Sequence, residues 1–276
     1  MDIEHFIQTE SDYFAPMLRR QLSTSANKTS RWREETVRQR HERISLEVYD
    51  LLNGTVTYGP FKGLKLTRFP YWGSFDLGSQ CLGLYELEVL EILRKLSPVS
   101  DRLFIDIGAA DGYYALGMLY ANKCAKAICF EKSERGRETI QQNAKLNNLE
   151  SGLFVLGEAT SESILCLSPT DLVGAVVIID IEGYEFELLT ETVLRQLKNC
   201  TLIIEIHNWV ENFEEKYPAF LRVASLFFDI EIIERFGRDT SNMPELRDFT
   251  DDNRLLCVSE RRPCLQRFLK LTGRVT

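Results

Sequence analysis

The sequence lacks the features that mark several classes of protein. No apolar run approaches the length needed to cross a membrane, and the start, Met1-Asp-Ile-Glu-His5, lacks the positive and apolar regions of a signal peptide. The seven cysteines form no Cys-x-x-Cys pair and no cluster with histidine, so we expect neither a disulfide framework nor a zinc site. These absences predict a cytoplasmic protein in a reducing compartment, without a membrane span.

The sequence also lacks an excess of positive charge. The 276 residues include 33 Lys and Arg against 41 Asp and Glu, a formal net charge of -8, and the basic residues are scattered among acidic ones. Proteins that bind nucleic acid usually gather basic residues into a patch, so we expect no nucleic acid as substrate. With 44% hydrophobic and 27% charged residues, the composition is that of an ordinary globular protein.

Three segments of the chain differ in pattern. Residues 1–82 are mostly polar with scattered apolar anchors, and a turn at Gly59–Gly63 separates two short apolar stretches, which predicts a helical and β-hairpin extension that packs on the core. Residues 83–262 form the predicted core domain, and residues 263–276 are expected to be a C-terminal tail. The apolar anchors of the extension are Phe6, Phe14, Leu18, Ile44, Val48 and Leu51.

Within the core domain, short apolar runs alternate with amphipathic stretches. Continuous apolar runs are typical of parallel strands buried on both faces, and the stretches between them are long enough for right-handed crossovers. The pattern predicts an α/β fold with a doubly wound, mostly parallel, seven-stranded sheet and helices on both faces. The predicted strands are Leu103–Ile107, Ala127–Phe130, Leu153–Leu156, Ala175–Ile181, Leu202–Ile206, Phe227–Ile233 and Leu255–Ser259, and the predicted helices are Leu84–Leu96, Tyr113–Asn122, Ser133–Asn147 and Tyr184–Leu197.

The first predicted strand runs into a glycine-containing loop, Phe104-Ile-Asp-Ile-Gly-Ala-Ala-Asp-Gly112. Ligands bind at such carboxyl ends of strands in doubly wound sheets. Gly108 and Gly112 let the backbone approach a ligand closely, and Asp106 can accept a hydrogen bond from an ammonium group. The amino group of a methionine moiety is one candidate for that donor.

The loop does not match the fingerprint of a dinucleotide site. That fingerprint has glycines at its first, third and sixth positions, but after Gly108 the third and sixth positions are Ala110 and Tyr113. Asp111 would also place a carboxylate near the pyrophosphate that a helix N-terminus normally stabilises. A cofactor without phosphate groups fits this loop better.

Two further predicted strands end in acids. Glu131 lies roughly 20 residues beyond the glycine loop, where a carboxylate can bind both hydroxyls of a ribose. Glu158 ends the next strand and could accept a hydrogen bond from the exocyclic amine of adenine. Asp106, Glu131 and Glu158 would then follow methionine, ribose and adenine along one sheet edge. The predicted cofactor-binding residues are Asp106, Gly108, Ala109, Gly112, Tyr113, Glu131, Lys132, Glu158, Ala159 and Asp180.

Acids and a histidine also end the fourth and fifth core strands, in Asp180-Ile-Glu-Gly-Tyr-Glu185 and Glu205-Ile-His207. Together with the glycine loop and Glu131, these motifs resemble the FkbM family of methyltransferases over roughly residues 83–210. That family's loop usually reads Gly-Ala-Asn-x-Gly, whereas Ala110 replaces the asparagine here. The resemblance implies a class I methyltransferase fold, S-adenosylmethionine as cofactor, and O-methylation of a hydroxyl on a sugar, a glycan or a secondary metabolite.

Methyl transfer to a hydroxyl requires a base, because a neutral hydroxyl is a poor nucleophile. His207 is the only histidine in the predicted sheet and titrates near neutral pH, which makes it one candidate, with Glu182 as the other. His207 could instead only hydrogen-bond Glu205 or a backbone carbonyl. An unpaired buried charge is expensive, so Asp180 and Glu182 should face a cleft, a cation or substrate hydroxyls. The predicted catalytic residues are therefore His207, Glu182 and Asp180.

The sequence leaves a metal ion open. Asp180, Glu182 and Glu205 would suit a hard divalent cation that holds two hydroxyls and lowers their pKa values. The same acids could hold neutral hydroxyls or attract a sulfonium without any ion. Tyr71, Trp72, Phe75 and Trp209 lie outside the predicted strands, and flat rings stack on planar ligands and sugar faces, although ordinary packing would also explain each of them. The segment Phe69–Gly73 is expected to contribute to the acceptor site.

Two other classes of protein share part of this pattern. A nicotinamide-dependent oxidoreductase has a similar sheet but needs the Gly-x-Gly-x-x-Gly loop that this chain lacks. A catalytically silent binding module would keep a nucleoside pocket without turnover. The sequence favours a methyltransferase that acts on a small-molecule or glycan hydroxyl, and it leaves the acceptor and the oligomeric state open.

Overall fold

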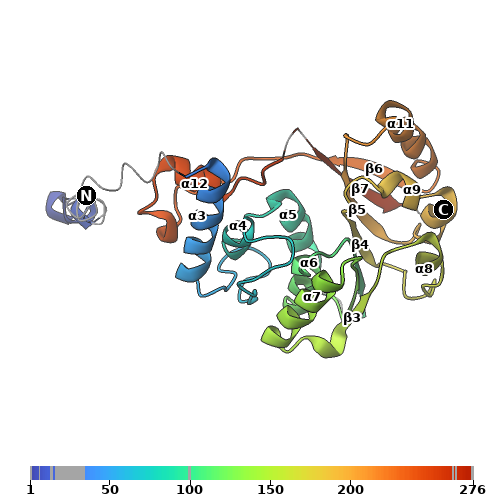
Figure 1. The fold of residues 1–276 in the computed structure, drawn as a ribbon, viewed down its shortest axis with the longest axis horizontal. Helices are drawn as coiled ribbons and strands as arrows, with labels where there is room; N and C mark the ends of the chain where they lie inside the picture. Colours follow the sequence, from blue (N-terminus) through green and yellow to red (C-terminus); the bar gives the residue numbers. More distant parts are fainter. Residues whose placement is uncertain are drawn as a thin grey trace.

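The computed structural model describes residues 2–5, 7–12, 15, 35–98, 101–262, 264 and 266–274 of the chain. Within these residues, one sheet is built from β1 (Leu103–Ile107), β2 (Lys126–Phe130), β3 (Leu153–Leu156), β4 (Val176–Ile179), β5 (Thr201–Ile206), β6 (Phe228–Ile233) and β7 (Arg267–Gly273). The strands follow the order β3-β2-β1-β4-β5-β7-β6 (Figure 1). Neighbours among β1 to β5 are parallel, and β7 is antiparallel to both β5 and β6. This doubly wound sheet is the class I methyltransferase fold that the sequence predicts.

The position of each strand in the sheet explains its residue pattern. Every residue of β1 and β4 is buried, because central parallel strands are covered on both faces and therefore show no alternation. The edge strand β3 instead alternates between half-buried and exposed residues, and Phe154 and Leu156 are partly in solvent. Polar groups of the central strands can therefore reach a ligand only near the strand ends.

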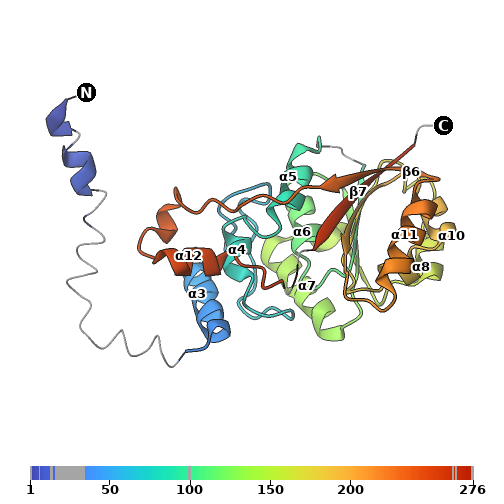
Figure 2. The same cartoon turned by 90° about the horizontal axis from the view of Figure 1, so that it is seen from above.

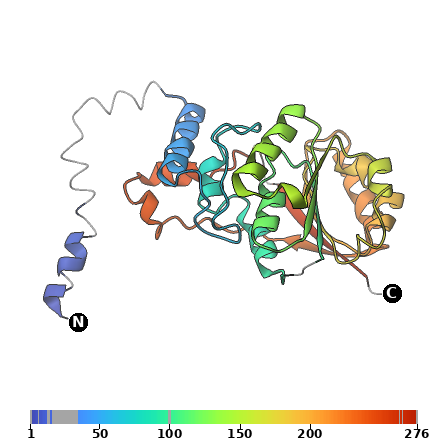
Figure 3. The same cartoon turned by 90° about the horizontal axis from the view of Figure 1, so that it is seen from below.

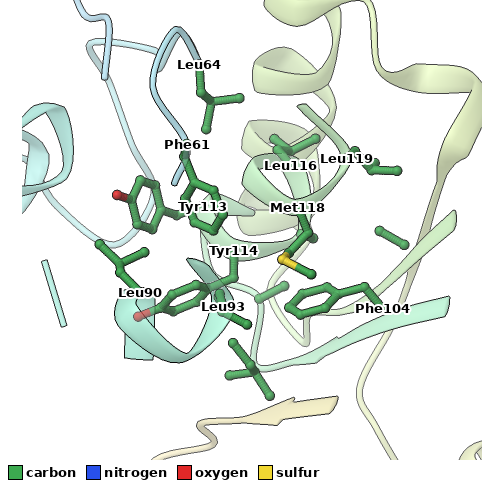
Figure 4. Close-up of a cluster of buried hydrophobic side chains, with 14 of the residues drawn as sticks. Phe61, Leu64, Leu90, Leu93, Phe104, Tyr113, Tyr114, Leu116, Met118 and Leu119 are labelled. Atoms are coloured by element: carbon green, nitrogen blue, oxygen red, sulfur yellow. The ribbon is translucent and has the colours of Figure 1, made fainter. Parts of the chain in front are cut away.

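Helices cover both faces of the sheet. One face carries α5 (Leu87–Lys95), α6 (Tyr113–Tyr120) and α7 (Glu134–Asn147), and the other carries α8 (Ser161–Leu165), α9 (Glu185–Leu188), α10 (Glu191–Gln196) and α11 (Phe213–Ala224), while η1 (Glu150–Gly152) precedes β3 (Figures 2 and 3). On the first face, Leu93, Phe104 and Leu116 share one buried cluster (Figure 4). On the second face, Val193 and Phe220 belong to another cluster. None of the described helices is long and apolar enough to cross a bilayer.

The N-terminal extension includes α3 (Val37–Leu51) and α4 (Leu77–Cys81). The predicted hairpin is present as one antiparallel bridge between Thr55 and Lys65. The long connection between β6 and β7 contributes η2 (Pro244–Leu246) and α12 (Asp251–Cys257), and both pack on α3 (Figure 1). Among the anchors predicted for the extension, Ile44 and Val48 are fully buried, Leu51 is exposed, and Phe6, Phe14 and Leu18 lie outside the described residues.

Two predictions about the C-terminal part are wrong. Residues 263–276 are not simply a tail, because Arg267–Gly273 form β7 in the middle of the antiparallel part of the sheet. Basic and polar residues interrupt the short apolar run of β7, so the sequence reads as a polar end. The predicted strand Leu255–Ser259 overlaps helix α12, which begins after Thr250, whose side chain accepts a hydrogen bond from the N–H of Asn253. This N-cap stabilises the first turn of a helix, so the segment forms a helix rather than a strand.

Candidate functional site

Most of the predicted site residues lie at the carboxyl ends of the parallel strands. The N–H groups of Gly108 and Ala109, in the loop after β1, donate to the carbonyl of Phe130 at the end of β2. The loop after β4, which begins with Asp180, packs against the same glycine loop. The ends of β1, β2 and β4 therefore form one continuous surface, and β5 adds His207 beside it.

Gly108 is required by a close backbone contact. Its φ is +87°, and a Cβ atom on this residue would lie 1.8 Å from the backbone oxygen of Asp180. Gly112 also has a positive φ, at the start of α6, where a Cβ would press on Ile140 at 3.2 Å. The glycines thus let the chain itself pack tightly, and this packing brings Asp180 next to the glycine loop.

Asp106 lies beneath the glycine loop. Its side chain is buried, and one carboxylate oxygen accepts a hydrogen bond from the N–H of Ala115 in α6 (3.2 Å). Burial raises the pKa of Asp106 to about 7, because desolvation disfavours the charged form. A positively charged group beside Asp106 would lower this pKa and favour the ionised carboxylate.

Glu131 is held by the backbone on both of its oxygens. Oε2 accepts from the N–H of Ala110 (2.9 Å), and Oε1 accepts from the N–H of Ser133 (2.7 Å) at the start of α7. These two bonds fix the carboxylate between the loop after β1 and the loop after β2. Each oxygen has a second lone-pair direction with which it can accept a hydrogen bond from a ligand.

The remaining residues predicted to bind the cofactor differ in position. Lys132 and Glu158 form an ion pair of 2.8 Å at the surface. The ring of Tyr113 packs against Phe61 in the core, and Ala159 is buried in the cluster on the other face of the sheet. The structure therefore brings Glu131 to the glycine loop, where the N–H of Ala110 donates to it, whereas Tyr113 directs its side chain toward the N-terminal extension.

His207 is the buried centre of an acidic cluster that is partly exposed at Asp180 and Glu182. Nδ1 of His207 contacts Oε1 of Glu185, which also accepts from the N–H of Gly183 (3.2 Å). Nε2 of His207 lies 3.5 Å from Oδ1 of Asp180 and 3.8 Å from Oε2 of Glu182. Glu185 ends the Asp-Ile-Glu-Gly-Tyr-Glu motif, but the motif alone does not indicate this contact with His207.

The charges of this cluster shift the pKa values of its members. Burial lowers the pKa of His207, but the hydrogen bond and charge of Glu185, with the nearby Asp180, outweigh burial and raise it above the ordinary value. Burial raises the pKa of Asp180, and the charges of His207 and Arg262 partly offset that rise. Oδ1 of Asp180 is buried and has no hydrogen-bond partner among the described residues. The cluster is therefore suited to receive a further donor or a positive charge.

Arg262 is a second residue that sequence reasoning did not find. It comes from the connection between β6 and β7, and its guanidinium contacts Glu205, donates to Glu86 (2.6 Å) and donates to Glu260 (2.9 Å). Tyr114 in α6 also donates to Glu86 (2.5 Å). Burial raises the pKa of Glu86 to about 8 in spite of Arg262. No spacing in the sequence indicates this network.

Two groups of described residues could hold a metal ion by their donor atoms. One is Asp180, Glu182 and His207, and the other is Glu86, Asp180 and Glu205. The second group already has a positive charge, because Arg262 contacts two of its carboxylates. The first group offers two carboxylates and one imidazole, a donor set that several divalent cations accept.

The aromatic residues that lie outside the predicted strands are divided between two places. The ring of Trp209 lies 4.7 Å from the ring of His207 and is partly exposed. The segment around Tyr71 lies instead at Asp111 in the glycine loop, because the carboxylate of Asp111 accepts from the N–H of Tyr71 (2.7 Å) and of Trp72 (3.3 Å). Only Trp209 is in direct contact with the histidine.

The chain matches no family model and no curated protein. It is similar in fold to a putative tRNA (m1A22) methyltransferase of Streptococcus pneumoniae in complex with S-adenosyl-L-methionine, at 16% identity and a TM-score of 0.43, covering 70% of this chain and 75% of that one. It is also similar to a precorrin-6y C5,15-methyltransferase of Geobacter metallireducens, at 19% identity and a TM-score of 0.42, covering 53% and 72%. The strand order defines the fold class, that of the S-adenosylmethionine-dependent class I methyltransferases.

Proposed function

We propose that the chain is an S-adenosylmethionine-dependent methyltransferase that methylates a hydroxyl oxygen of a small molecule or a glycan. One observation supports this most strongly: the contact between Gly108 and Asp180 joins the glycine loop to the His207 cluster. The loop proposed to hold the cofactor and the histidine proposed as the proton acceptor therefore lie side by side on one sheet edge. The FkbM resemblance adds the O-methylation of sugars, glycans or secondary metabolites to the proposal.

The cofactor is proposed to lie across the ends of β1, β2 and β3. Glu131, held by two backbone N–H groups, accepts hydrogen bonds from the ribose hydroxyls. Asp106 lies at the methionine end, where the ammonium group supplies the positive charge that a buried carboxylate needs. Glu158 accepts from the adenine amine. The backbone of Gly108, Ala109, Gly112 and Tyr113 borders the methionine end, and Lys132, Ala159 and Asp180 complete the predicted set.

In the proposed reaction, the acceptor oxygen attacks the methyl carbon in line with the carbon–sulfur bond. The oxygen–carbon bond forms while the carbon–sulfur bond breaks, its electron pair stays on sulfur as S-adenosylhomocysteine, and the hydroxyl proton passes to Nε2 of His207. Glu185, at Nδ1, fixes the ring and stabilises the imidazolium. Asp180 and Glu182 accept hydrogen bonds from acceptor hydroxyls and attract the sulfonium charge. Asp180 and Glu182 can hold hydroxyls and attract the sulfonium without a metal ion.

The proposal can be tested with labelled cofactor. The protein is incubated with methyl-labelled S-adenosylmethionine and, separately, with fractionated metabolites, glycans and tRNA, each with and without a chelator. We expect label in a hydroxyl of the metabolite or glycan fraction. Label in tRNA would overturn the proposed acceptor, and loss of transfer with the chelator would assign a role to a metal ion.

A second experiment, combined with the labelling, separates the two alternative classes. Calorimetric titration with S-adenosylmethionine and with a reduced nicotinamide cofactor should show binding of the first only. Binding of the nicotinamide cofactor instead would indicate an oxidoreductase. Binding of S-adenosylmethionine without transfer to any fraction would indicate a silent binding module.

A further inference from the structure

A segment of the N-terminal extension is attached to the cofactor side of the proposed site. Asn147 in α7 accepts from the N–H of Lys65 (2.8 Å) and donates to its carbonyl (2.8 Å). Asn143, one turn earlier in α7, accepts from the N–H of Thr67 (2.7 Å). With the two bonds to Asp111, these contacts fix residues 65–72 along α7 and the glycine loop. Loops are generally more mobile than the elements they connect, and this attachment holds the segment in one position beside α7.

The attachment places the ring of Tyr71 beside Glu131. A Cβ atom on Gly136, in α7, would lie 2.9 Å from the carboxyl carbon of Glu131 and 3.1 Å from Cδ1 of Tyr71. The two side chains therefore occupy the space that a side chain at position 136 would fill. Glycine inside a helix is unfavourable compared with alanine, and here the close approach of Glu131 and Tyr71 explains it.

From this geometry we propose that Tyr71 contacts the ribose and adenine end of the bound cofactor, and that Asp111 is the residue that positions it. The inference rests on the proposed function, because it uses the ribose position next to Glu131. It reassigns the aromatic segment, which the sequence analysis expected at the acceptor, to the cofactor. An aromatic ring against the nucleoside buries apolar surface without adding charge beside Glu131.

The chemistry of Asp111 suits this positioning role. The N–H groups of Tyr71 and Trp72 are adjacent donors, and a carboxylate offers one acceptor oxygen to each. An asparagine has only one such oxygen, and its amide group would face the second N–H. Asn143 also donates to the backbone oxygen of Asp111 (3.0 Å). Helix α7 therefore bonds both to the loop that carries Asp111 and to the segment that carries Tyr71.

The test measures affinity for S-adenosylhomocysteine and for adenosine by calorimetry. Tyr71→Ala should weaken both ligands by about tenfold, since loss of an aromatic contact of this kind corresponds to about that ratio. Tyr71→Phe should stay within about twofold, because the ring carries the contact. Asp111→Asn should give a smaller loss than Tyr71→Ala. Lys65→Ala is the control in the same segment, because the side chain of Lys65 is exposed and its bonds to Asn147 are made by its backbone, and this variant should bind normally.

Hydrogen exchange distinguishes a ligand contact from a purely structural role. Saturating S-adenosylhomocysteine should slow amide exchange of residues 67–73 in the wild type but much less in Tyr71→Ala. If the wild type binds neither ligand, the proposed function itself fails and takes this inference with it. If the wild type binds and folded Tyr71→Ala binds equally well, the inference alone is wrong.

Discussion

The two halves of the sheet's carboxyl edge are built in different ways. In the half formed by β1 and β2, the acids are held by backbone N–H groups: Ala110 and Ser133 hold Glu131, and Ala115 holds Asp106. In the half formed by β4 and β5, side chains hold each other, as Glu185 holds His207. The first half therefore has a geometry fixed by the main chain, and the second depends on the charge of every partner.

This difference suits two tasks. A cofactor that is the same in every turnover is best held by a preformed backbone frame, which costs little to organise on binding. Proton transfer needs groups whose protonation can change, and a buried network of side chains makes their pKa values depend on one another. Mutations should therefore separate binding from chemistry according to the half in which they fall.

The largest effect is expected for His207→Ala. Loss of a general base typically slows a reaction by about 10² to 10⁴-fold, so methyl transfer should fall in that range while the affinity for S-adenosylhomocysteine changes little. Transfer is measured on the acceptor identified by labelling, and binding by calorimetry. Transfer at the normal rate would rule out His207 as the base.

Glu185→Gln is a matched variant for that prediction. Glutamine keeps a hydrogen-bonding group near Nδ1 but removes the charge that raises the pKa of His207. A base must be unprotonated to act, so the rise of the rate with pH should move to lower pH in this variant. An unchanged pH profile would show that Glu185 does not act through His207.

Arg262→Met tests how strongly the second half depends on charge balance. The change leaves Glu86, Glu205 and Glu260 buried without their shared cation, and breaking a buried ion pair in this way costs about 3–5 kcal/mol. The free energy of unfolding is measured in urea. Arg274→Met is the control, because Arg274 pairs with Asp229 at the surface and its loss should cost at most about 1 kcal/mol. Equal losses in the two variants would show that the buried network adds no stability.

The same contrast explains what the sequence could predict. Ala110 and Glu131 are only 21 residues apart, in one strand–loop–helix–strand unit, so the glycine loop and the acid after the next strand are readable together. Arg262 and Glu86 are 176 residues apart, and no local pattern joins them. Glu185 is near in sequence, but it begins a helix, α9, of only four residues, too short for a periodicity that shows where its side chain points. The sequence therefore predicts the acids and the histidine that directly follow the strands, including Asp180, Glu182 and His207. It does not predict Glu185 and Arg262, the partners that hold the second half together.

Glu131→Ala tests the first half directly. Hydrogen bonds to a charged group contribute about 1.5–3 kcal/mol, so affinity for S-adenosylhomocysteine should fall by about 10- to 100-fold. Glu138→Ala is the control, because Glu138 is exposed in α7, the helix that follows Glu131, and this variant should bind normally. If Glu131→Ala binds as tightly as the control, the ribose does not lie at Glu131.

Asp106→Asn tests how the stability of the same half depends on pH, because it removes a carboxyl group that titrates. The pKa of Asp106 is raised from 3.8 to about 7 in the folded chain, so folding favours its protonated form. Its contribution to stability is present below pH 4 and is lost as the pH rises toward 7. The unliganded Asn variant should therefore match the wild type at pH 4 and exceed its stability at pH 8, measured by urea unfolding. A wild type that stays more stable at pH 8 would show that Asp106 is not strained by its burial.

The smallest effect is expected for Glu158→Gln, at the end of β3. Glu158 is half exposed and already paired with Lys132, and exposed polar contacts compete with water, so affinity for S-adenosylhomocysteine should change by less than about threefold. Raising the salt concentration should reduce even this difference, because exposed charges are screened. A loss as large as that of Glu131→Ala would mean that the contact of Glu158 with the adenine amine contributes as much affinity as the backbone-held acid after β2, which its exposure and its pairing with Lys132 do not predict.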